Sequence, residues 1–539
     1  MVNKLTTRAI PESGSIEDLF NVINHLKKQN EHNKLLNLTR EGLHKFPNND
    51  LLFVEFCLAL EENKMASEAI DSLRSGLKLN QESNPISGTL IGMLFRTRRY
   101  AEMKIEINKY IEKLRKKNIN NANIHNIVTT LTSICLHSMY MDDFSDNDRW
   151  AIHSKFGQIM SKNMIKIYGM DNAKKIKSIG FVSNQLYKNH PVGRFSTKLI
   201  RELSANGYMI YIYHNTLRDH NSFVAVEEEF INTNVTIRKI SSDNPVGSAQ
   251  IVRADKVNLL IDLAGCTEGN ALAMFACRPA PIQASWIGYP GHPGIKEIDF
   301  FLSDNFCSPF NGLHPKEMTK KIYRFKRFFT CYEAPHVNGG DTPPIESNGI
   351  VSFGSFNNID KISKETIRVW SAVLNATPNS ILALKFFKKT EHQLEEIKKL
   401  FSILGVDDSR IKIMPKSSSL AETLLSYDEI DIALDTFPYN GMTTTCDALW
   451  MGVPVITHYG TSHVSCASSS ILQSIGAPEL IAEDWDSFVE KTKNLASDIK
   501  RLKFYKKNLR RMMLRSEVCD EKDMAIHFGD FVSSLEIKK

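Results

Sequence analysis

The sequence predicts a helical domain followed by two α/β domains, each built on a doubly wound parallel sheet. Amphipathic helical segments follow one another over residues 16–117, and from Lys177 onward short apolar runs of strand length alternate with helical stretches. At 539 residues the chain is also too long for one hydrophobic core. We therefore predict an all-α domain over residues 1–170, a first α/β domain over 171–345 and a second over 346–539.

The N-terminal helices show a repeating pattern. Gly42 in REGLHKF and Gly76 in RSGLKLN occupy equivalent places 34 residues apart, and Ala66 and Ala101, which each open a predicted helix, are 35 residues apart. These spacings are close to the period of tetratricopeptide helical hairpins, which stack into a solenoid. A generic helical bundle is the alternative. Either form indicates a recognition or packing module without chemistry of its own.

Helical character continues over Ile124–Met164, interrupted by the acidic loop MDDFSDND, whose charge we expect to be solvated. Beyond it, the first series of predicted strands comprises KSIGFVSN, YMIYIYHN, VNLLIDLAG, PIQASWIGYP and DFFLSD, with helices such as Phe195–Asn206 and Phe223–Phe230 between them. The second series comprises IVSFGSF, SILALKF, RIKIM, EIDIALD and VPVITH, and it follows a Pro- and Gly-containing segment over Phe325–Asn348. Two such domains leave a cleft at the carboxyl ends of their strands, where ligands bind. The charged helical stretch Trp485–Lys539 is expected to pack outside the second sheet.

The composition is typical of a globular protein. Hydrophobic residues make up 42% and charged residues 24%, and a net charge of +6 is spread along the chain, so no nucleic-acid-binding signature is visible. No apolar run reaches the length of a signal peptide or a membrane span. The nine Cys residues occur singly, without a CxxC pair or a Cys/His cluster at zinc spacing. We expect a cytoplasmic protein that uses no metal.

The stretch Phe437–Val455, FPYNGMTTTCDALWMGVPV, is the strongest candidate for a binding site. It joins the apolar run Ile432–Leu434 to a short predicted helix at Ala448–Met451 through a turn rich in Gly, Asn and Thr. A helix start exposes unpaired N–H groups and the positive end of the helix dipole, so this turn could hold a phosphate. Asp447 could accept hydrogen bonds from an adjacent ribose diol. The stretch therefore predicts a nucleotide site, with an ordinary helix N-cap as the alternative.

The same stretch closely resembles the nucleotide loop of the O-GlcNAc transferase and SPINDLY-type glycosyltransferases (GT41). Two further segments resemble this family, and in total the resemblance spans residues 176–531. It implies the GT-B architecture, in which two Rossmann-like lobes face a cleft, together with a UDP-sugar donor, a protein acceptor and no metal. A short repeat array, and no long insertion between the lobes, resemble the bacterial members. The two segments are VNLLIDLAGCTEGNALAMFACRPAPIQASWIGYPGHPGIKEIDFFLSD and IVSFGSFNNIDKISKETIRVW.

His190 is the first candidate catalytic residue. It lies just past the strand IGFVSN, where cleft residues are expected, and Pro191 and Gly193 hold the chain in a tight connection. A lone His is often structural, but this loop resembles the family's HP-containing loop, whose His lies beside the reacting sugar. Asp255, before the strand VNLLID, and Asp262, near its end, are carboxylates that could relay a proton. For Asp262 a strand-end cap is the alternative.

Lys361 is the second candidate catalytic residue, because in the family a Lys at this place contacts the donor phosphates. Its task would be to offset charge on the departing UDP. Tyr439 stands where animal enzymes carry a small residue near the N-acetyl group, so the identity of the hexose stays open. The resemblance assigns the UDP-sugar to Asn358, Lys361, Pro415, Lys416, Tyr439, Met442, Thr443, Thr444 and Asp447.

Gly288, Tyr289, Pro290 and Gly291 form a loop that we expect to contact the sugar or the acceptor. Glycines allow a backbone to approach a sugar or peptide closely. Their spacing, with Gly294, is GxxGxxG, which differs from the dinucleotide-binding fingerprint GxGxxG.

The resemblance implies an inverting, metal-independent protein O-glycosyltransferase that moves a sugar, most simply N-acetylglucosamine, from UDP to Ser or Thr. Three alternatives remain open: a protein N-glycosyltransferase that uses UDP-glucose and Asn acceptors, fucosyl transfer from GDP-fucose, and a non-catalytic helical-repeat scaffold. The helical repeats would bind the acceptor protein, and their exposed faces could form a homodimer. No nucleic acid or membrane partner is expected.

Overall fold

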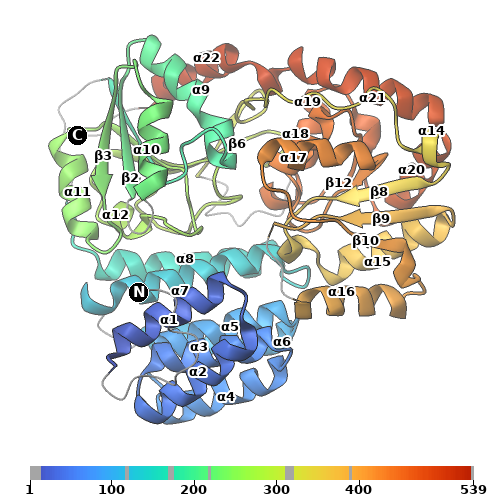
Figure 1. The fold of residues 1–539 in the computed structure, drawn as a ribbon. Coiled ribbons are helices and arrows are strands. Elements are labelled where there is room, and N and C mark those ends of the chain that lie inside the picture. The colour runs from blue at the N-terminus through green and yellow to red at the C-terminus, as the bar shows by residue number, and fades with distance from the viewer. Residues whose placement is uncertain are drawn as a thin grey trace, which may run out of the picture. The chain divides into compact units, whose positions relative to one another are not determined.

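The computed structural model describes the chain over residues 14–115, 121–167, 175–215, 220–309, 321–387 and 391–535. Its residues form two compact units, coloured by residue number in Figure 1. The first unit holds Met1–Lys117 with Lys389–Lys399, and the second holds Asn118–Lys388 with Leu400–Lys539. Both sheets belong to the second unit. None of the helices described is long and apolar enough to be a membrane-spanning candidate.

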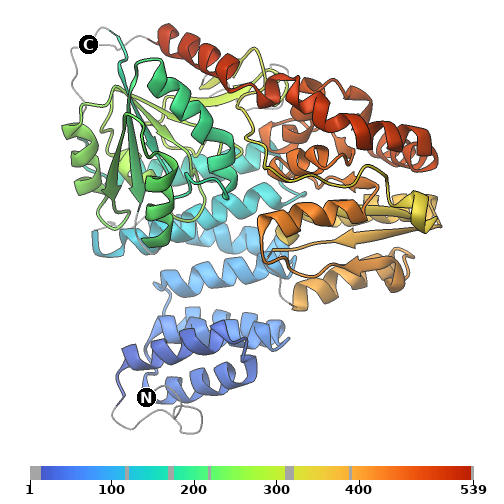
Figure 2. The same ribbon diagram turned by 45° about the horizontal axis from the view of Figure 1, so that its top comes forward.

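Three helical hairpins build the first unit and repeat every 34 residues, which confirms the predicted period. Each helix packs against its neighbours in sequence, and α3 also packs against α5, as in stacked hairpins (Figure 2). The first helices of the three hairpins are α1 (Ile16–Lys28), α3 (Asp50–Glu62) and α5 (Asn84–Arg96). The second helices are α2 (His32–Lys45), α4 (Ala66–Leu79) and α6 (Tyr100–Arg115).

Residues at the same 34-residue spacing shape every hairpin. The first helices are capped by side chains that accept a hydrogen bond from the backbone N–H three residues later, and these caps are Ser15, Asn49 and Ser83. The turns between paired helices contain a residue with positive φ, namely Asn30, Lys64 and Arg98. These recurring caps and turns explain why the three hairpins repeat so regularly.

Gly42 and Gly76 occupy equivalent places in the packing of the repeats. A Cβ added at Gly42 would lie 2.7 Å from Leu19 Cδ2, and one added at Gly76 would lie 2.6 Å from Phe53 Cε1. Both contacts are closer than a methyl group tolerates, so each glycine lets its helix pack tightly against the preceding helix.

The helices α7 (Asn121–Tyr140) and α8 (Asp146–Asn163) belong to the second unit, so the helical region does not form one domain up to residue 170. Close backbone packing explains this grouping, because a Cβ at Gly157 of α8 would lie 1.9 Å from the Gly294 carbonyl oxygen. The acidic loop between the two helices is also more than solvated charge. Asp142 accepts a hydrogen bond from the Glu365 backbone N–H, and Asp146 accepts one from the Ser462 hydroxyl.

The first sheet has seven parallel strands in the order β3-β2-β1-β4-β5-β6-β7. Five are the predicted apolar runs. The strand β3 was not predicted because only its last residue is buried, and β7 was not predicted because it is only four residues long. The strands are β1 (Ser178–Val182), β2 (Met209–Asn215), β3 (Val235–Ile240), β4 (Leu259–Asp262), β5 (Ile282–Ser285), β6 (Phe300–Asp304) and β7 (Ile322–Phe325).

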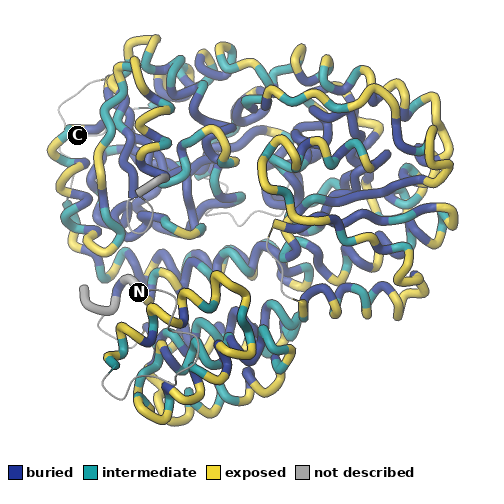
Figure 3. Tube along the Cα trace, viewed as in Figure 1, coloured by how far each residue is buried: buried dark blue, intermediate teal, exposed yellow. Residues whose placement is uncertain are grey.

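The second sheet has six parallel strands in the order β10-β9-β8-β11-β12-β13. Most of these strands are buried, as Figure 3 shows in dark blue. The predicted runs account for all but β13, which has two residues. The strands are β8 (Val351–Ser355), β9 (Ser380–Leu384), β10 (Ile411–Ile413), β11 (Ile432–Leu434), β12 (Val455–His458) and β13 (Ile481–Ala482).

Helices separate the strands of both sheets. They are α9 (Pro191–Ala205), α10 (His220–Glu229), α11 (Pro245–Ala254), α12 (Leu272–Ala276), α14 (Ile345–Asn348), α15 (Lys364–Ala376), α16 (Glu391–Ile403), α17 (Leu420–Leu425), α18 (Thr443–Trp450) and α19 (Ala467–Ser474). The strand order reverses between β1 and β4 and between β8 and β11. Ligands of doubly wound sheets bind outside the carboxyl ends of the strands at these positions. The predicted α/β class with two doubly wound sheets is confirmed.

The C-terminal helices are α20 (Trp485–Ser497), α21 (Ile499–Leu514) and α22 (Glu521–Ser534). The first two pack in the second lobe as predicted, whereas α22 returns to the first lobe and packs against α9. Phe528 lies 5.5 Å from Trp286 and Phe531 lies 4.6 Å from Tyr323, measured between ring centroids. The expectation that residues 485–539 all pack outside the second sheet is therefore wrong, because the aromatic face of α22 covers the first sheet.

Candidate active site

His190 lies at the carboxyl edge of the first sheet, where the chain turns from β1 into α9. It is the N-cap of α9, and its Nδ1 accepts a hydrogen bond from the Val192 backbone N–H at 3.2 Å. Pro191 occupies the first helical position, for which its fixed φ is suited. At Gly193 a Cβ would lie 2.1 Å from the Tyr187 carbonyl oxygen, so only glycine fits. The helix therefore begins four residues before the predicted start at Phe195.

The cap fixes the chemistry that His190 can perform. A nitrogen that accepts a hydrogen bond carries no proton, so Nδ1 is unprotonated and Nε2 remains as the outward-facing nitrogen. Burial lowers the pKa of His190 to about 4, because the surrounding protein disfavours the charged imidazolium. Near neutral pH the ring is therefore an uncharged imidazole, with Nε2–H available as a donor.

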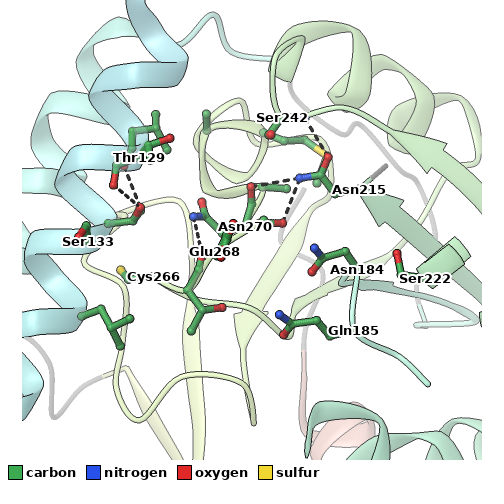
Figure 4. A pocket seen from close by; sticks show the side chains of 18 of the residues that line it. Thr129, Ser133, Asn184, Gln185, Asn215, Ser222, Ser242, Cys266, Glu268 and Asn270 are labelled. Atoms are coloured by element: carbon green, nitrogen blue, oxygen red, sulfur yellow. Dashed lines mark hydrogen bonds between the residues drawn. The ribbon is translucent and has the colours of Figure 1, made fainter. Parts of the chain in front are cut away.

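A pocket of about 540 Å³ opens beside His190. The loops after β1, β2, β3 and β4 line it on one side and α7 on the other, with Thr129 and Ser133 from α7 labelled in Figure 4. Asn215 holds these loops together, since its amide nitrogen donates to the Gly269 carbonyl and its amide oxygen accepts from the Ser242 N–H. Most of the residues that line the pocket have uncharged polar side chains, and the pocket has the size of a ligand site.

Asn184 is one polar group aimed at this pocket (Figure 4). Its Oδ1 is buried and accepts no hydrogen bond from any residue that the structure describes. A buried acceptor without a partner is costly, so Asn184 is suited to receive a donor from a bound molecule.

Lys361 lies at the carboxyl edge of the second sheet, in the short 3-10 helix Ile359–Lys361 that follows β8. Its Nζ donates to the Asn440 carbonyl oxygen at 2.8 Å and lies 4.2 Å from the centroid of the Tyr439 ring. Burial lowers the pKa of Lys361 to about 8, and the nearby Asp435 carboxylate opposes this shift. The ammonium group is thus poorly solvated and suited to an incoming anion.

Asn357 connects Lys361 to the start of α18. Its side-chain oxygen accepts a hydrogen bond from Thr444 Oγ1 at 2.9 Å and lies 3.5 Å from Lys361 Nζ. The Tyr427 hydroxyl donates to the Thr444 carbonyl oxygen at 3.1 Å. These hydrogen bonds hold the loop after β8 and the first turn of α18 close to the Lys361 ammonium group.

Helix α18 begins at Thr443, five residues before the predicted start at Ala448. Met442 is its N-cap, and Thr443 and Thr444 form its first turn rather than the preceding loop. Asp435 shapes that loop by accepting hydrogen bonds from the backbone N–H groups of Thr436 and Gly441. The first N–H groups of the helix have no intrahelical partner, and the helix begins three residues after Asn440, whose carbonyl oxygen binds Lys361.

Tyr439 stacks on Tyr140 at the end of α7, with ring centroids 4.9 Å apart and planes 26° from parallel. Lys361 Nζ also lies over the Tyr439 ring, so this ring contacts both an ammonium group and Tyr140 of α7. Tyr439 is therefore held rigidly beside the Lys361 ammonium group.

Asp447, one turn into α18, joins the two lobes. Its carboxylate accepts hydrogen bonds from Arg194 of α9, with Nη2–Oδ1 at 2.5 Å and Nη1–Oδ2 at 3.3 Å, and from the Tyr332 hydroxyl at 2.6 Å. These three bonds occupy three of the roughly four lone-pair directions of a carboxylate. One direction, on Oδ2, remains for a further donor.

The site thus contains two sets of residues: the His190 set, which comprises His190 with Asn184 and Asn215, and the Lys361 set, which comprises Lys361 with Asn357, Tyr439, Thr443 and Thr444. Both sets come from the strand ends where nucleotide-binding enzymes place their sites. Comparison with known proteins identifies the family. A family model described as Glycosyl transferase family 41 matches residues 123–335 and 344–528. The chain belongs to glycosyltransferase family 41.

Two curated relatives show how far the similarity of this family 41 chain extends. A probable UDP-N-acetylglucosamine–peptide N-acetylglucosaminyltransferase SPINDLY of Hordeum vulgare is 32% identical over 393 residues, which are 71% of this chain and 41% of that protein. The protein of the same description in Arabidopsis thaliana is 30% identical over 395 residues, 72% of this chain and 43% of that protein. The chain thus spans less than half the length of these relatives.

A solved structure shows the fold of this family 41 chain. A mutant O-GlcNAc transferase of Thermobaculum terrenum superimposes with a TM-score of 0.76 at 22% identity, over 95% of this chain and 96% of that one. The predicted GT-B architecture, preceded in the chain by a helical N-terminal region, is confirmed.

Some residues of the family 41 chain that were predicted to belong to the site lie away from both the His190 set and the Lys361 set. Asp255 ends α11, which returns the chain toward the amino ends of the strands, and it pairs with Arg238 and accepts from the Tyr213 hydroxyl. These contacts give Asp255 a structural role, and its predicted part in catalysis stays a prediction. Asp262 accepts hydrogen bonds from the backbone of Ala264 and Gly265, which is the strand-end cap considered as its alternative.

Asn358 is exposed and caps the 3-10 turn by accepting from the Asp360 N–H, while the buried side chain of its neighbour Asn357 contacts Thr444 and Lys361. The contact of Asn358 with the nucleotide stays a prediction. Pro415 and Lys416 follow β10, an outer strand of the second sheet, on the same edge as Lys361 but two strands from β8. The Pro415 carbonyl accepts from Lys385 Nζ at 2.7 Å. These two residues stay predictions for the far end of a nucleotide.

The loop Gly288–Gly291 packs against the protein itself. A Cβ at Gly288 would lie 1.9 Å from the Leu263 carbonyl oxygen, and one at Gly291 would lie 2.8 Å from Met139 Cε. Tyr289 is fully buried, and Pro290 lies partly exposed between them. The glycines are therefore needed for internal packing, and a direct contact of this loop with sugar or acceptor is not supported by the geometry.

Four residues of the site were missed in the sequence: Arg194, Tyr332, Asn357 and Tyr427. The position of Arg194 carried a signal, because it lies one helical turn after His190 on the same helix face. The sequence gives no signal for Tyr332 and Tyr427, because each reaches the site from a segment without a motif.

Proposed function

We propose that this chain transfers a sugar from a UDP-sugar to a Ser or Thr hydroxyl of a protein, with inversion at the anomeric carbon. One observation carries the proposal. The His190 set and the Lys361 set come from the carboxyl edges of the two sheets, and the Arg194–Asp447 pair joins them. The description of the Hordeum vulgare relative, which names UDP-N-acetylglucosamine and a peptide, supports N-acetylglucosamine as the sugar and a protein as the acceptor.

In this proposal the second lobe binds the UDP moiety. The diphosphate lies at the start of α18, where backbone N–H groups and the hydroxyls of Thr443 and Thr444 donate to its oxygens. Lys361 exchanges its hydrogen bond to the Asn440 carbonyl for one to phosphate, and Asp447 uses its remaining lone pair for the ribose. The hollow now present between Asn357, Tyr427 and Thr444 measures about 10 Å³, so these side chains must separate when UDP binds.

The transfer step follows from this arrangement. The acceptor oxygen forms a bond to the anomeric carbon while the bond from that carbon to the UDP oxygen breaks, and the bonding electrons leave with UDP. Lys361 and the start of α18 stabilise the charge that develops on UDP, which is the role a metal has in other enzymes of this type. Transfer is thus proposed to need no metal in the reaction.

His190 holds the acceptor side of the reaction. As a neutral ring whose Nδ1 is used by the helix cap, it presents Nε2–H toward the region where sugar and acceptor meet. It is proposed to orient donor or acceptor oxygens by hydrogen bonding, and the acceptor proton passes to solvent. The 540 Å³ pocket beside it would receive the acceptor chain, with Asn184 as one contact.

Incubation of the whole chain with labelled UDP-N-acetylglucosamine, UDP-glucose or GDP-fucose and a peptide mixture, in the presence of EDTA, tests this function. The expected product carries N-acetylglucosamine that alkaline β-elimination releases, with inverted anomeric configuration by NMR. Lys361→Ala is expected to lose UDP binding in calorimetry. Asn-linked glucose or a fucosylated product would replace the proposal with another transferase, and failure of all nucleotides to bind would favour the scaffold.

A further inference from the structure

Two thiols and an imidazole meet in the core of the first lobe, outside the site described above. Cys135 comes from α7, His153 from α8 and Cys266 from the loop after β4. The two sulfur atoms and a ring nitrogen of His153 lie within 4.8 Å of one another, and the three side chains are at most 1% exposed. Over the part of the chain that the structure describes, no other three His, Cys, Asp or Glu side chains come together in this way.

The tautomer of His153 leaves a lone pair on Nε2, which faces the Tyr289 hydroxyl. Its Nδ1 lies 2.6 Å from the Arg149 carbonyl oxygen, which can only accept a hydrogen bond, so Nδ1 carries the proton. Its Nε2 is therefore unprotonated, and it lies 2.5 Å from the hydroxyl of the buried Tyr289. A His whose second nitrogen donates to a backbone carbonyl is the usual arrangement of a metal ligand.

Another buried thiol of the same lobe is placed differently. The thiol of Cys277 donates to the Ala273 carbonyl oxygen, one turn earlier in its own chain segment, as a small buried side chain often does. Cys135 and Cys266 instead come from segments 131 residues apart and meet beside the imidazole of His153, whose orientation is fixed by the Arg149 carbonyl. The cluster thus combines the ligand types, burial and orientation of a closed metal site.

We propose that Cys135, His153 and Cys266 bind a zinc ion, with the Tyr289 hydroxyl oxygen at the fourth tetrahedral position. Binding releases both thiol protons to solvent, and the two thiolates neutralise the charge of the dication. Ligand atoms on a zinc ion lie about 3.5 Å from one another. The sulfur and nitrogen atoms, now within 4.8 Å, must therefore approach each other, and His153 Nε2 and the Tyr289 hydroxyl, now 2.5 Å apart, must separate by roughly 1 Å. A closed site of this kind is structural, because no coordination position is left open for a substrate.

The ion would add metal bonds between elements that already meet through packing and through the His153–Tyr289 hydrogen bond. It links α7 and α8 to the loops after β4 and β5. One of the proposed ligands, Cys266, also lines the 540 Å³ pocket (Figure 4). The proposal is independent of the transferase reaction, since neither Lys361 nor His190 takes part. The sequence predicted no metal because it contains no Cys/His cluster at zinc spacing. The proposed ligands escape that criterion because they come from three distant segments and leave no motif in the sequence.

Elemental analysis of the whole protein, produced with zinc in the medium and purified without chelator, tests the site. About one zinc ion per chain is expected, and Cys135→Ser with Cys266→Ser should retain less than about a tenth of it. Cys277→Ala, which removes a buried thiol of the same lobe, should retain the full amount. Cobalt-substituted protein should show thiolate-to-metal charge-transfer absorption that the double variant lacks, and zinc should raise the thermal midpoint of unfolding of the original chain only.

The wild-type measurements keep the test independent of whether the variants fold. Wild-type protein that binds neither zinc nor cobalt would overturn the proposal, as would zinc retained by a folded double variant. A disulfide between Cys135 and Cys266, detected by mass spectrometry without reduction, would show instead that the two thiols pair with each other.

Discussion

Arg194 of the first lobe and Asp447 of the second form a buried ion pair with two hydrogen bonds. Their side chains are 4% and 9% exposed, and the Tyr332 hydroxyl completes the contact. Because Arg194 follows His190 by one turn of α9 and Asp447 follows Thr443 by one turn of α18, the pair fixes the two helix starts relative to each other. The proposed acceptor and donor residues are thus aligned by an interaction in which neither substrate takes part.

Replacement of Arg194 by Met is expected to lower the free energy of unfolding by about 3–5 kcal/mol, because it leaves the Asp447 carboxylate buried without its charge partner. Denaturant titration measures this loss. The matched control is Arg238→Met, which breaks an ion pair whose Arg side chain is 45% exposed and should cost less than about 1 kcal/mol. Arg194→Met combined with Asp447→Leu should cost less than the sum of the single changes, and strict additivity would contradict the coupling.

His190 carries two separable roles, and two substitutions distinguish them. His190→Asn keeps a side-chain acceptor for the Val192 N–H, so the helix cap and thermal stability should remain while sugar transfer is lost. His190→Ala removes the cap as well and should cost about 1 kcal/mol in addition to activity. Calorimetric unfolding and a transfer assay on both variants give the result. Full activity in His190→Asn would assign His190 to the cap alone.

Lys361 should make UDP affinity depend on pH in the alkaline range. Its pKa of about 8 in the free protein means that the ammonium form, which attracts the diphosphate, is lost as the pH rises through 8. Affinity is therefore expected to be level from pH 7 to about 8 and then to fall up to about tenfold per pH unit, since the diphosphate of UDP completes its ionisation below this range. Lys361→Arg retains its charge, so its affinity should stay level to about pH 9, below the range in which the uracil ring itself ionises. Equal slopes for both proteins would exclude Lys361 as the titrating group.

The neighbouring residues Asn357 and Asn358 provide an internal comparison. Asn357 contacts Thr444 and Lys361, so Asn357→Ala should weaken UDP binding by about tenfold or more. Asn358 is exposed and only caps a 3-10 turn, so Asn358→Ala should change affinity by less than about twofold. Isothermal titration of UDP measures both. A larger effect at Asn358 would reverse the assignment and restore the prediction made from the sequence.

Features encoded by neighbouring residues were predictable from the sequence. The glycine spacing of Gly42 and Gly76 indicated the helical period because the same close helix contact recurs at both. The segments around Lys361 and Thr444 were recognisable because each is a strand end followed by a short turn and a helix. The sequence could not show whether Asn357 or Asn358 contacts Lys361. Adjacent side chains point in different directions, and only the backbone shows which one turns inward.

Features made by distant residues were not predictable. Arg194 and Asp447 are 253 residues apart and belong to no common motif. The return of α22 to the first lobe depends on which apolar face is left uncovered, and Trp286 and Tyr323 do not reveal this in sequence. The contacts of Asp255 with Arg238 and Tyr213 were not predictable either, because proximity to a strand in the sequence does not tell which side chains a residue contacts.

The return of α22 also has a consequence for the order of events on the ribosome. The strands of the first sheet are made by residue 325, but the aromatic side chains that cover Trp286 and Tyr323 emerge about 200 residues later. During this interval the nascent first lobe exposes an aromatic surface while the whole second lobe is being synthesised. Its folding can be completed only after the second lobe has been made, although it comes first in the chain.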